Sequence, residues 1–277
     1  MERGILYIAK GDEFVQEAII SAQRTKSVMP DCPITLVADH DPTEDCFDRV
    51  LLDESPFLKR DKAAAMQRTP YERTLYLDTD IYLEQPVWEL FDILDDFDVA
   101  IRMAREMAHI PTGGSTTVDG VPPGVPEFNG GVIAYRDTET VMEMLADWAS
   151  RCLPEHEWDQ RTLRPALYHS DVRLCPIQNR YNCMYRFDNK VVGEIKVFHG
   201  PLIDRERNSI DTNTAREKLN TTEGFRIHRN YLNTLFVDPP LPLTTKARIS
   251  VRRFYELFRE QGLRETIRRT LQYFSTS

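Results

Sequence analysis

Two aspartates separated by one residue follow an apolar run in the middle of the chain. The run 74–77 contains only β-branched, aliphatic and aromatic residues, and Asp78 and Asp80 come directly after it. Such a run is typical of a strand that is buried on both faces. Because side chains alternate along an extended chain, the two carboxylates share one face. Two carboxylates this close repel each other unless a cation lies between them, and their oxygens favour Mg²⁺ or Mn²⁺.

A simpler interpretation is that the pair caps a strand at the surface. A second apolar run, 81–83, follows the pair, and this favours the metal site over full solvation. A third ligand is available at His199, which ends the predicted strand 194–199. A histidine at a strand end is more often structural, but beside an Asp-x-Asp pair it becomes a candidate ligand through a neutral imidazole nitrogen. This mixed nitrogen and oxygen set, together with a diphosphate, suits Mn²⁺ better than Ca²⁺.

Asn129, Gly130 and Gly131 precede a predicted strand at 132–135. Glycines let a backbone approach a ligand closely, and the Asn129 amide can hydrogen-bond a sugar hydroxyl. A tight strand entry or a β-bulge explains the same residues without any ligand, and taken alone this explanation is the stronger.

Three further polar residues lie on predicted helices. Lys62 belongs to the helix 57–68 and could reach a diphosphate or a sugar, or could equally be a solvated surface lysine. Asp159 and Gln160 open the helix 159–168. Asp159 on its own is explained as an N-cap, because its carboxylate can accept a hydrogen bond from the first turn.

Strand and helix patterns alternate around these residues. We predict strands at 5–9, 33–38, 49–52 and 98–102, helices at 13–25, 86–94 and 138–152, and an irregular stretch that begins at 172–175, besides the elements named above. The alternation predicts an α/β fold with a largely parallel sheet, whose ligands bind at the carboxyl ends of the strands. No glycine-rich phosphate loop is present, so a metal is a candidate for holding phosphate. The loop 111–126, rich in Gly, Thr and Pro, is predicted to be mobile and to order when substrate binds.

The composition narrows the class of protein. The chain has 277 residues and a net charge of −9, which argues against nucleic acid as the main partner. Its five cysteines show no C-x-x-C spacing, so neither a disulfide framework nor a zinc site is predicted and a reducing compartment fits. No signal peptide or membrane-spanning run is recognised, so we expect a cytoplasmic location.

A change of charge marks the C-terminal end. We predict a domain at 1–240 and a basic helical tail at 241–277, which holds eight Lys or Arg and three Glu. Two amphipathic helices are expected at 249–259 and 263–274, separated by Gln261 and Gly262. Such basic helices bind a membrane surface, here through 245–277 on its inner face, or pack against the protein's own body. The sequence leaves both interpretations open.

Four motifs in a fixed order resemble the GT-A glycosyltransferases of glycosyltransferase family 8, which includes glycogenin and the lipopolysaccharide galactosyltransferases. They are Asp78-Thr79-Asp80, Phe128-Asn-Gly-Gly-Val132, Asp159-Gln160 and His199-Gly200, and the resemblance covers roughly residues 4–203. It implies a GT-A (Rossmann-like) α/β domain with a mixed, mainly parallel sheet. It also implies a metal-dependent enzyme that transfers a sugar from a nucleotide-diphosphate donor, usually a UDP-sugar, with retention of configuration.

The resemblance further implies a role for each matching residue. The metal ligands for Mn²⁺ or Mg²⁺ would be Asp78, Asp80 and His199. The residue beside the reaction centre would be Gln160, and Asp159 would be an acidic sugar contact. The donor contacts would be Ala9, Asp12, Lys62, Asp78, Thr79, Asn129, Gly130 and Gly200. The basic tail, which resembles that of bacterial members, favours a lipid-linked glycan or a polysaccharide as the acceptor.

The chain departs from the family at one place. Many members continue after the histidine and glycine with Lys-Pro-Trp, whereas this chain has Pro201 and Leu202 and lacks that lysine. Arg205 or Arg207 could supply the missing cation. Two alternatives stay open: a metal-dependent phosphatase of the haloacid dehalogenase type, with Asp78 as nucleophile, and a non-catalytic protein that binds sugar nucleotides. The sequence specifies neither the sugar nor the oligomeric state.

Overall fold

The computed structural model describes residues 1–55, 61–104, 120–152, 160–187, 189–203, 211–220, 224–231 and 234–237, and isolated residues between 251 and 268. Two units are distinguished, Met1–Val237 and Asp238–Ser277. In the second, described residues such as Val251 and Phe258 are helical, and Gly262 has a φ of 77°. The two helices predicted there remain predictions. Within the described residues, no helix has the length and apolarity needed to cross a membrane.

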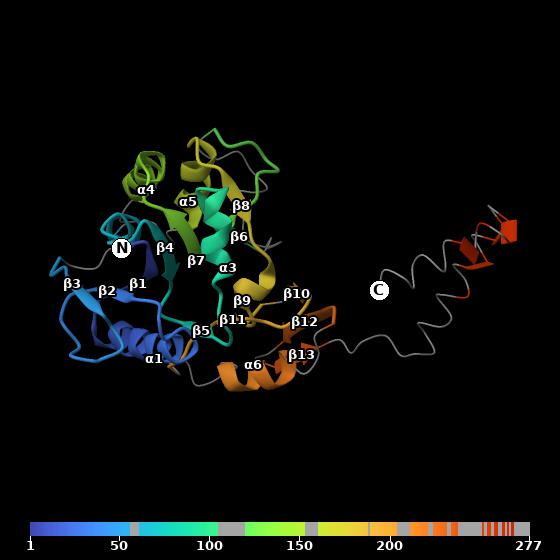
Figure 1. Ribbon diagram of the computed structural model, residues 1–277, viewed down its shortest axis with the longest axis horizontal. Coiled ribbons are helices and arrows are strands. Elements are labelled where there is room, and N and C mark those ends of the chain that lie inside the picture. The colour runs from blue at the N-terminus through green and yellow to red at the C-terminus, as the bar shows by residue number, and fades with distance from the viewer. Residues whose placement is uncertain are drawn as a thin grey trace. The chain divides into compact units, whose positions relative to one another are not determined.

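A seven-stranded sheet forms the centre of the first unit (Figure 1). Its order is β3 (Arg49–Leu52), β2 (Ile34–Ala38), β1 (Arg3–Ala9), β4 (Arg73–Leu77), β7 (Phe128–Arg136), β6 (Val99–Met103) and β8 (Leu174–Pro176). β1 pairs in parallel with β2 and β4, whereas β7 runs antiparallel to both of its neighbours. The sheet is therefore mixed and mainly parallel, as predicted. Because β7 is reversed, its first residues lie at the edge where β4 ends.

Helices cover both faces of this sheet. Alternate strand residues enter two separate cores, with Tyr7 of β1 in one and Leu6 in the other. The first core includes α1 (Asp12–Val28) and α3 (Glu89–Asp92), which continues as the short 3-10 helix η1 (Ile93–Asp95). The second includes α2 (Asp61–Met66), α4 (Glu139–Arg151) and α5 (Gln160–Tyr168). A sheet buried on both faces explains why its strands are continuous apolar runs.

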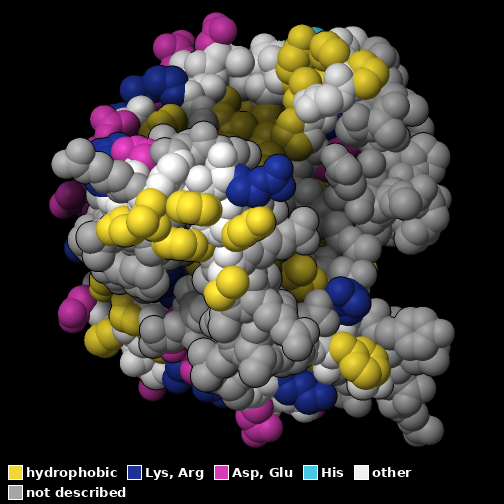
Figure 2. All heavy atoms as spheres, turned by 90° about the vertical axis from the view of Figure 1, so that its right-hand side faces the viewer, with side chains coloured by type: hydrophobic (Ala, Val, Ile, Leu, Met, Phe, Trp, Pro, Cys, Tyr) yellow, Lys and Arg dark blue, Asp and Glu magenta, His cyan; other side chains and the backbone are white. Residues whose placement is uncertain are grey.

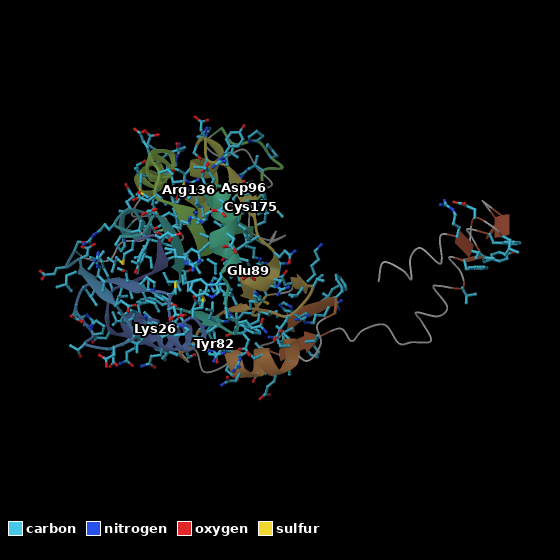
Figure 3. The ribbon with its side chains drawn as sticks, viewed as in Figure 1. Lys26, Tyr82, Glu89, Asp96, Arg136 and Cys175 are labelled. Atoms are coloured by element: carbon cyan, nitrogen blue, oxygen red, sulfur yellow. The ribbon has the colours of Figure 1, made fainter. Side chains whose placement is uncertain are left out.

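Two smaller sheets lie beyond the central one. The first has the order β5 (Ile81–Leu83), β11 (Val197–His199) and β9 (Cys183–Met184), and the 3-10 helix η3 (Asn179–Tyr181) precedes β9. The second has the order β10 (Asn189–Val191), β12 (Arg226–Tyr231) and β13 (Thr234–Val237), and α6 (Thr212–Leu219) packs into the same core. The ring of Tyr82 in β5, a residue labelled in Figure 3, lies 5.0 Å from the Arg24 guanidinium and 4.7 Å from that of Arg216. These contacts join α1, β5 and α6.

Several predicted boundaries are wrong. β7 begins at Phe128, four residues earlier than predicted, because Phe128 and Asn129 pair with Met103 and Arg102 of β6. The glycine pair therefore lies inside a strand. The strand predicted from residue 194 begins at Val197, and α3 has four residues in place of the predicted nine. Most of the loop predicted to be mobile, 111–119, lies outside the described residues, as does 57–60 of the helix predicted before β4.

Apolar side chains are also exposed on the first unit. Phe187, Val192, Phe225 and Phe236, which are 40–61% exposed, lie on or beside the strands of the sheet β10-β12-β13. Figure 2 shows one face of the molecule, where yellow apolar groups stand among lysine and arginine side chains. Single exposed apolar residues are normal on protein surfaces and do not by themselves indicate a binding site.

Candidate metal centre

Asp78 and Asp80 occupy the turn between β4 of the central sheet and β5 of the small sheet. His199 ends β11, which pairs antiparallel with β5 so that His199 lies opposite Ile81. The backbone N–H of Gly200 donates to the Asp80 carbonyl at 2.9 Å. Strand pairing therefore brings the imidazole beside the two carboxylates, although more than a hundred residues separate them in the sequence.

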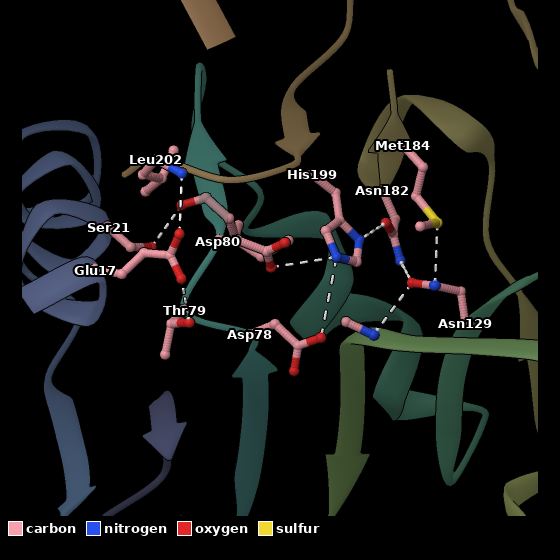
Figure 4. A network of polar contacts seen from close by, with 12 residues as sticks. Glu17, Ser21, Asp78, Thr79, Asp80, Asn129, Asn182, Met184, His199 and Leu202 are labelled. Atoms are coloured by element: carbon pink, nitrogen blue, oxygen red, sulfur yellow. Dashed lines mark hydrogen bonds and ion pairs between the residues drawn. The ribbon is translucent and has the colours of Figure 1, made fainter. Parts of the chain in front are cut away.

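Each of the three side chains offers one ligand atom, and these atoms lie within 4.8 Å of one another. His199 Nε2 is 3.3 Å from Asp80 Oδ1 and 4.0 Å from Asp78 Oδ2 (Figure 4). Two carboxylates and one imidazole are a donor set that suits Mn²⁺, Mg²⁺ or another divalent ion. The cluster is therefore a candidate metal centre at the carboxyl edge of the sheet.

The three groups shift one another's pKa values. Burial opposes ionisation of Asp80, but the adjacent His199 outweighs it and lowers the pKa of Asp80 overall. Burial likewise opposes a charge on His199, yet Asp80 and Asp78 raise the pKa of the imidazole overall. A divalent cation bound here would compete with a proton for the imidazole, because a histidine binds a metal through a deprotonated nitrogen.

Asp78 is held from the side opposite His199. Its Oδ1 accepts hydrogen bonds from Lys62 Nζ at 2.9 Å and from the Tyr76 hydroxyl at 2.5 Å, so Oδ2 faces the imidazole. The Lys62 ammonium also lies 4.9 Å from the centre of the Tyr76 ring and 6.0 Å from that of Trp148. The structure therefore places Lys62 beside the cluster, where its charge offsets one of the two carboxylates.

Helix α1 supports the turn that carries the aspartates. The Thr79 hydroxyl donates to Glu17 Oε2 at 2.7 Å, and the Leu202 N–H donates to Glu17 Oε1 at 3.0 Å (Figure 4). The Ser21 hydroxyl donates to the Ile81 carbonyl at 2.6 Å. Glu17 is only 2% exposed, so one buried carboxylate joins the segments on both sides of the cluster. The hydroxyl of Thr79, a predicted donor contact, therefore points toward α1.

Asn129, a predicted sugar contact, is buried and hydrogen-bonded within the protein. Only 5% of it is exposed, its Oδ1 accepts the Gly131 N–H at 3.1 Å, and its Nδ2 lies 3.1 Å from Met184 Sδ. Asn182 Nδ2 donates to the same Oδ1 at 2.7 Å, and Asn182 Oδ1 lies 2.8 Å from His199 Nδ1. These two amides therefore stand behind the imidazole. Sequence analysis missed the contribution of Asn182.

The glycines allow the close approach of large side chains. A Cβ added to Gly131 would lie 2.2 Å from His199 Cε1, and one added to Gly200 would lie 2.5 Å from Tyr185 Cζ. A Cβ on Gly130 would lie 3.3 Å from Lys62 Nζ, the flexible end of a long side chain. The approach of His199 thus requires a glycine at 131 and that of Tyr185 requires one at 200, while Gly130 borders Lys62.

The remaining predicted site residues are Ala9, Asp12, Asp159 and Gln160. Ala9 ends β1 and is buried, and Asp12 is the exposed first residue of α1. No hydrogen bond or ion pair described here links either of them to the cluster. Asp159 lies outside the described residues, and Gln160 opens α5 with a side chain that is also outside them.

The sequence matches no protein-family model and no curated protein. Solved structures match in fold. The galactosyltransferase LgtC, in complex with donor and acceptor sugar analogs, aligns with a TM-score of 0.55 and 15% identity over 79% of this chain and 97% of that one. The chain has the GT-A fold. The glycosyltransferase GlyE of Streptococcus pneumoniae aligns with a TM-score of 0.54 and 14% identity, over 80% of this chain and 61% of that one. The GT-A domain predicted from the ordered motifs is thereby confirmed.

Proposed function

We propose that this protein is a metal-dependent glycosyltransferase, which moves a sugar from a UDP-sugar or a related nucleotide-diphosphate donor to an acceptor hydroxyl. The observation that carries the proposal is the convergence of Asp78, Asp80 and His199 at the carboxyl edge of a GT-A sheet. Ligands of open α/β sheets bind at this edge. The glycosyltransferases that share the fold support the choice of reaction.

In this proposal Asp78, Asp80 and His199 hold Mn²⁺ or Mg²⁺. The bound ion would neutralise the charge that develops on the departing nucleotide diphosphate. Lys62 would keep Asp78 oriented and add a positive charge near the phosphates, because its ammonium already lies 2.9 Å from Asp78 Oδ1. Burial of the imidazole, which is 7% exposed, limits the access of water to that ligand.

The remaining contacts are assigned by the resemblance. Ala9 and Asp12, at the end of β1, would face the nucleotide, and Gly130 and Gly200 would let the donor approach the backbone. Asp159 would bind the donor sugar, and Gln160 would position groups at the reaction centre without forming a covalent bond. The acceptor would then attack the face from which the diphosphate leaves, which retains the anomeric configuration.

The test is a screen of nucleotide sugars for Mn²⁺-dependent thermal stabilisation and hydrolysis. We expect one UDP-sugar to stand out and Asp80→Ala to abolish both responses. A phosphatase of the haloacid dehalogenase type would instead hydrolyse a generic phosphomonoester and ignore nucleotide sugars. Stabilisation without any turnover, in the presence of candidate acceptors, would indicate a protein that only binds sugar nucleotides.

We further propose that the acceptor is a lipid-linked glycan and that residues 245–277 contact the inner face of the membrane. The tail holds eight basic and three acidic residues, which favours binding to anionic lipids. Deletion of 243–277 should release the protein from anionic vesicles and leave donor hydrolysis unchanged, as measured by flotation and by nucleotide release. Full-length protein that does not bind such vesicles would contradict the membrane proposal.

A further inference from the structure

A chain of hydrogen bonds runs from the backbone of β7 to the imidazole of the candidate metal centre. It passes from Gly131 N–H to Asn129, from Asn129 to Asn182, and from Asn182 to His199, with separations of 3.1, 2.7 and 2.8 Å (Figure 4). Asn182 is fully buried, and Asn129 and His199 are almost so. These hydrogen bonds are therefore shielded from water, and the buried polar groups must find their hydrogen-bond partners within the protein.

The direction of every hydrogen bond in this chain follows from its first donor. The oxygen and nitrogen of an amide side chain are hard to distinguish, so its orientation must be inferred from a partner of known type. The Gly131 N–H is such a partner, because a backbone nitrogen can only donate. Asn129 must then present its oxygen to Gly131, and the same oxygen requires a donor, the amide nitrogen, from Asn182. The Asn182 oxygen consequently faces His199 Nδ1.

An amide oxygen accepts hydrogen bonds and cannot donate them. His199 Nδ1 must therefore carry a proton in this arrangement. In the neutral imidazole the other nitrogen, Nε2, then holds the lone pair. Nε2 is the nitrogen that lies 3.3 Å from Asp80 Oδ1 and 4.0 Å from Asp78 Oδ2. The hydrogen-bond chain thus directs a lone pair to the place where the carboxylates converge.

We propose that Asn182 and Asn129 are positioning residues, which fix the Nδ1–H tautomer and the ring orientation of His199 so that Nε2 can bind the metal. The inference rests on the proposed metal centre. It adds two residues that would act on the ion through His199 and would not bind the ion themselves. Loss of a hydrogen-bond partner of a metal-binding histidine typically weakens metal binding about 10- to 100-fold.

A buried arginine holds the two amides in register. Arg102 lies opposite Asn129 in the β6–β7 pair, at a shift of register between Ile101 and Arg102. Its Nη1 donates to the Asn182 carbonyl at 3.0 Å, and its Nε donates to Asn179 Oδ1 at 2.7 Å. The backbone of Asn182 is therefore anchored independently of its side chain. A substitution of that side chain can remove the contact with His199 while this anchor remains.

The first test measures the affinity of the full chain for Mn²⁺ alone, from the loss of the free-ion signal in electron paramagnetic resonance. Asn182→Leu removes the acceptor and should weaken binding about 10- to 100-fold. Asn182→Asp restores an oxygen toward Nδ1 and should bind at least as tightly as the wild type. Met184→Leu is the matched control. It removes the sulfur contact of Asn129 but none of the hydrogen bonds between Gly131 and His199, so it should not change the affinity.

The second test observes the tautomer directly, from ring-nitrogen resonances of ¹⁵N-histidine in metal-free protein in alkaline buffer. The chain has six histidines, so the resonance of His199 is identified by its loss in His199→Gln. In the wild type we expect the proton on Nδ1, and in Asn182→Leu a shift of the proton toward Nε2. If Asn182→Leu does not fold, Asn129→Ala should produce the same shift, whereas Asn129→Asp, which keeps both acceptor contacts, should not.

A wild-type proton on Nε2, or unchanged Mn²⁺ binding by folded Asn182→Leu, would overturn the inference. Failure of the proposed function gives a different result. In that case the wild type would bind Mn²⁺ and show the expected tautomer, but no nucleotide sugar would stabilise the protein. The two proposals can therefore fail separately.

Discussion

Two corners of the central sheet collect acidic side chains at the ends of parallel strands. At the first, after β1, β2 and β3, Lys10 Nζ lies 3.0 Å from Asp53 Oδ2 and donates to the Ser55 hydroxyl at 2.9 Å. Asp39 Oδ2 accepts the Gly11 N–H at 2.8 Å. Both acids there have donors supplied by the chain. Hydrogen bonds from Ser55 and Lys10 lower the pKa of Asp53 to about 2.

At the second corner, after β4, the acids are only partly compensated. Lys62 binds Asp78 Oδ1, whereas Asp78 Oδ2 and Asp80 Oδ1 lie 4.0 and 3.3 Å from His199 Nε2. A protonated lysine has no lone pair with which to bind a metal ion, whereas a neutral imidazole has one. Acidic residues at strand ends therefore do not by themselves indicate a metal site. What distinguishes the second corner is a third group that can bind the same cation.

The largest expected difference is between two variants, each of which removes one acidic side chain from one of the corners. Asp80→Ala should weaken Mn²⁺ binding by more than roughly 100-fold, because a lost ligand should cost more than a lost partner of a ligand. Asp53→Ala should leave Mn²⁺ affinity unchanged. Isothermal titration calorimetry with Mn²⁺ alone measures both. Equal weakening by the two variants would show that the corners do not differ in this way.

A smaller effect is expected from the glycine pair at the second corner. Gly131→Ala places a methyl group 2.2 Å from His199 Cε1 and should displace the imidazole, weakening Mn²⁺ binding about 10- to 100-fold and stability by about 1–3 kcal/mol. Gly130→Ala, whose methyl group has its closest contact with the flexible end of Lys62 at 3.3 Å, should change Mn²⁺ affinity much less. Denaturant unfolding and Mn²⁺ titration test this pair. Equal losses in both variants would contradict the specific role of Gly131.

The smallest expected effect concerns acid stability at the first corner. The pKa of Asp53 is about 2 in the folded protein, against about 3.9 for an unperturbed Asp. The contribution of ionised Asp53 to folding stability is therefore present above about pH 4 and is lost as the pH falls toward about 2. Lys10→Met should lower the stability at neutral pH by about 1 kcal/mol or less and reduce its dependence on pH in that window. Urea unfolding across this range measures both, and an unchanged dependence would assign the shift to Ser55 alone.

Much of the central sheet was predictable because its strands are continuous apolar runs. The strands of the sheet β10-β12-β13 were not predicted, and β12 shows the physical reason. Arg226 and His228 of β12 are buried, while the next residue, Arg229, is exposed. With polar side chains on the buried face, the strand lacks the usual alternation of apolar and polar residues. The Arg226 guanidinium can be buried because it donates to the carbonyls of Gly193 and Gly224 and to Asn220 Oδ1.

The same distinction applies to the candidate site. Asp78, Asp80 and His199 could be proposed from residue type, strand position and order along the chain. Asn182 and Glu17 could not, because their contacts join residues 53 and 185 positions apart. A buried glutamate in an amphipathic helix and an asparagine in an irregular segment carry no local signal. Their roles become visible only when the fold brings separate segments together.

The reversed direction of β7 has a consequence for how such a scaffold can diverge. The Ala104 N–H donates to the Glu127 carbonyl at 2.7 Å, so the connection from β6 to β7 is closed at its base beside the strand ends. Both ends of this connection are fixed by sheet pairing. Insertions and substitutions between them can therefore accumulate during evolution without changing the strand register. Descendants of one ancestor could in this way change this connection while keeping the positions of Asp78, Asp80 and His199.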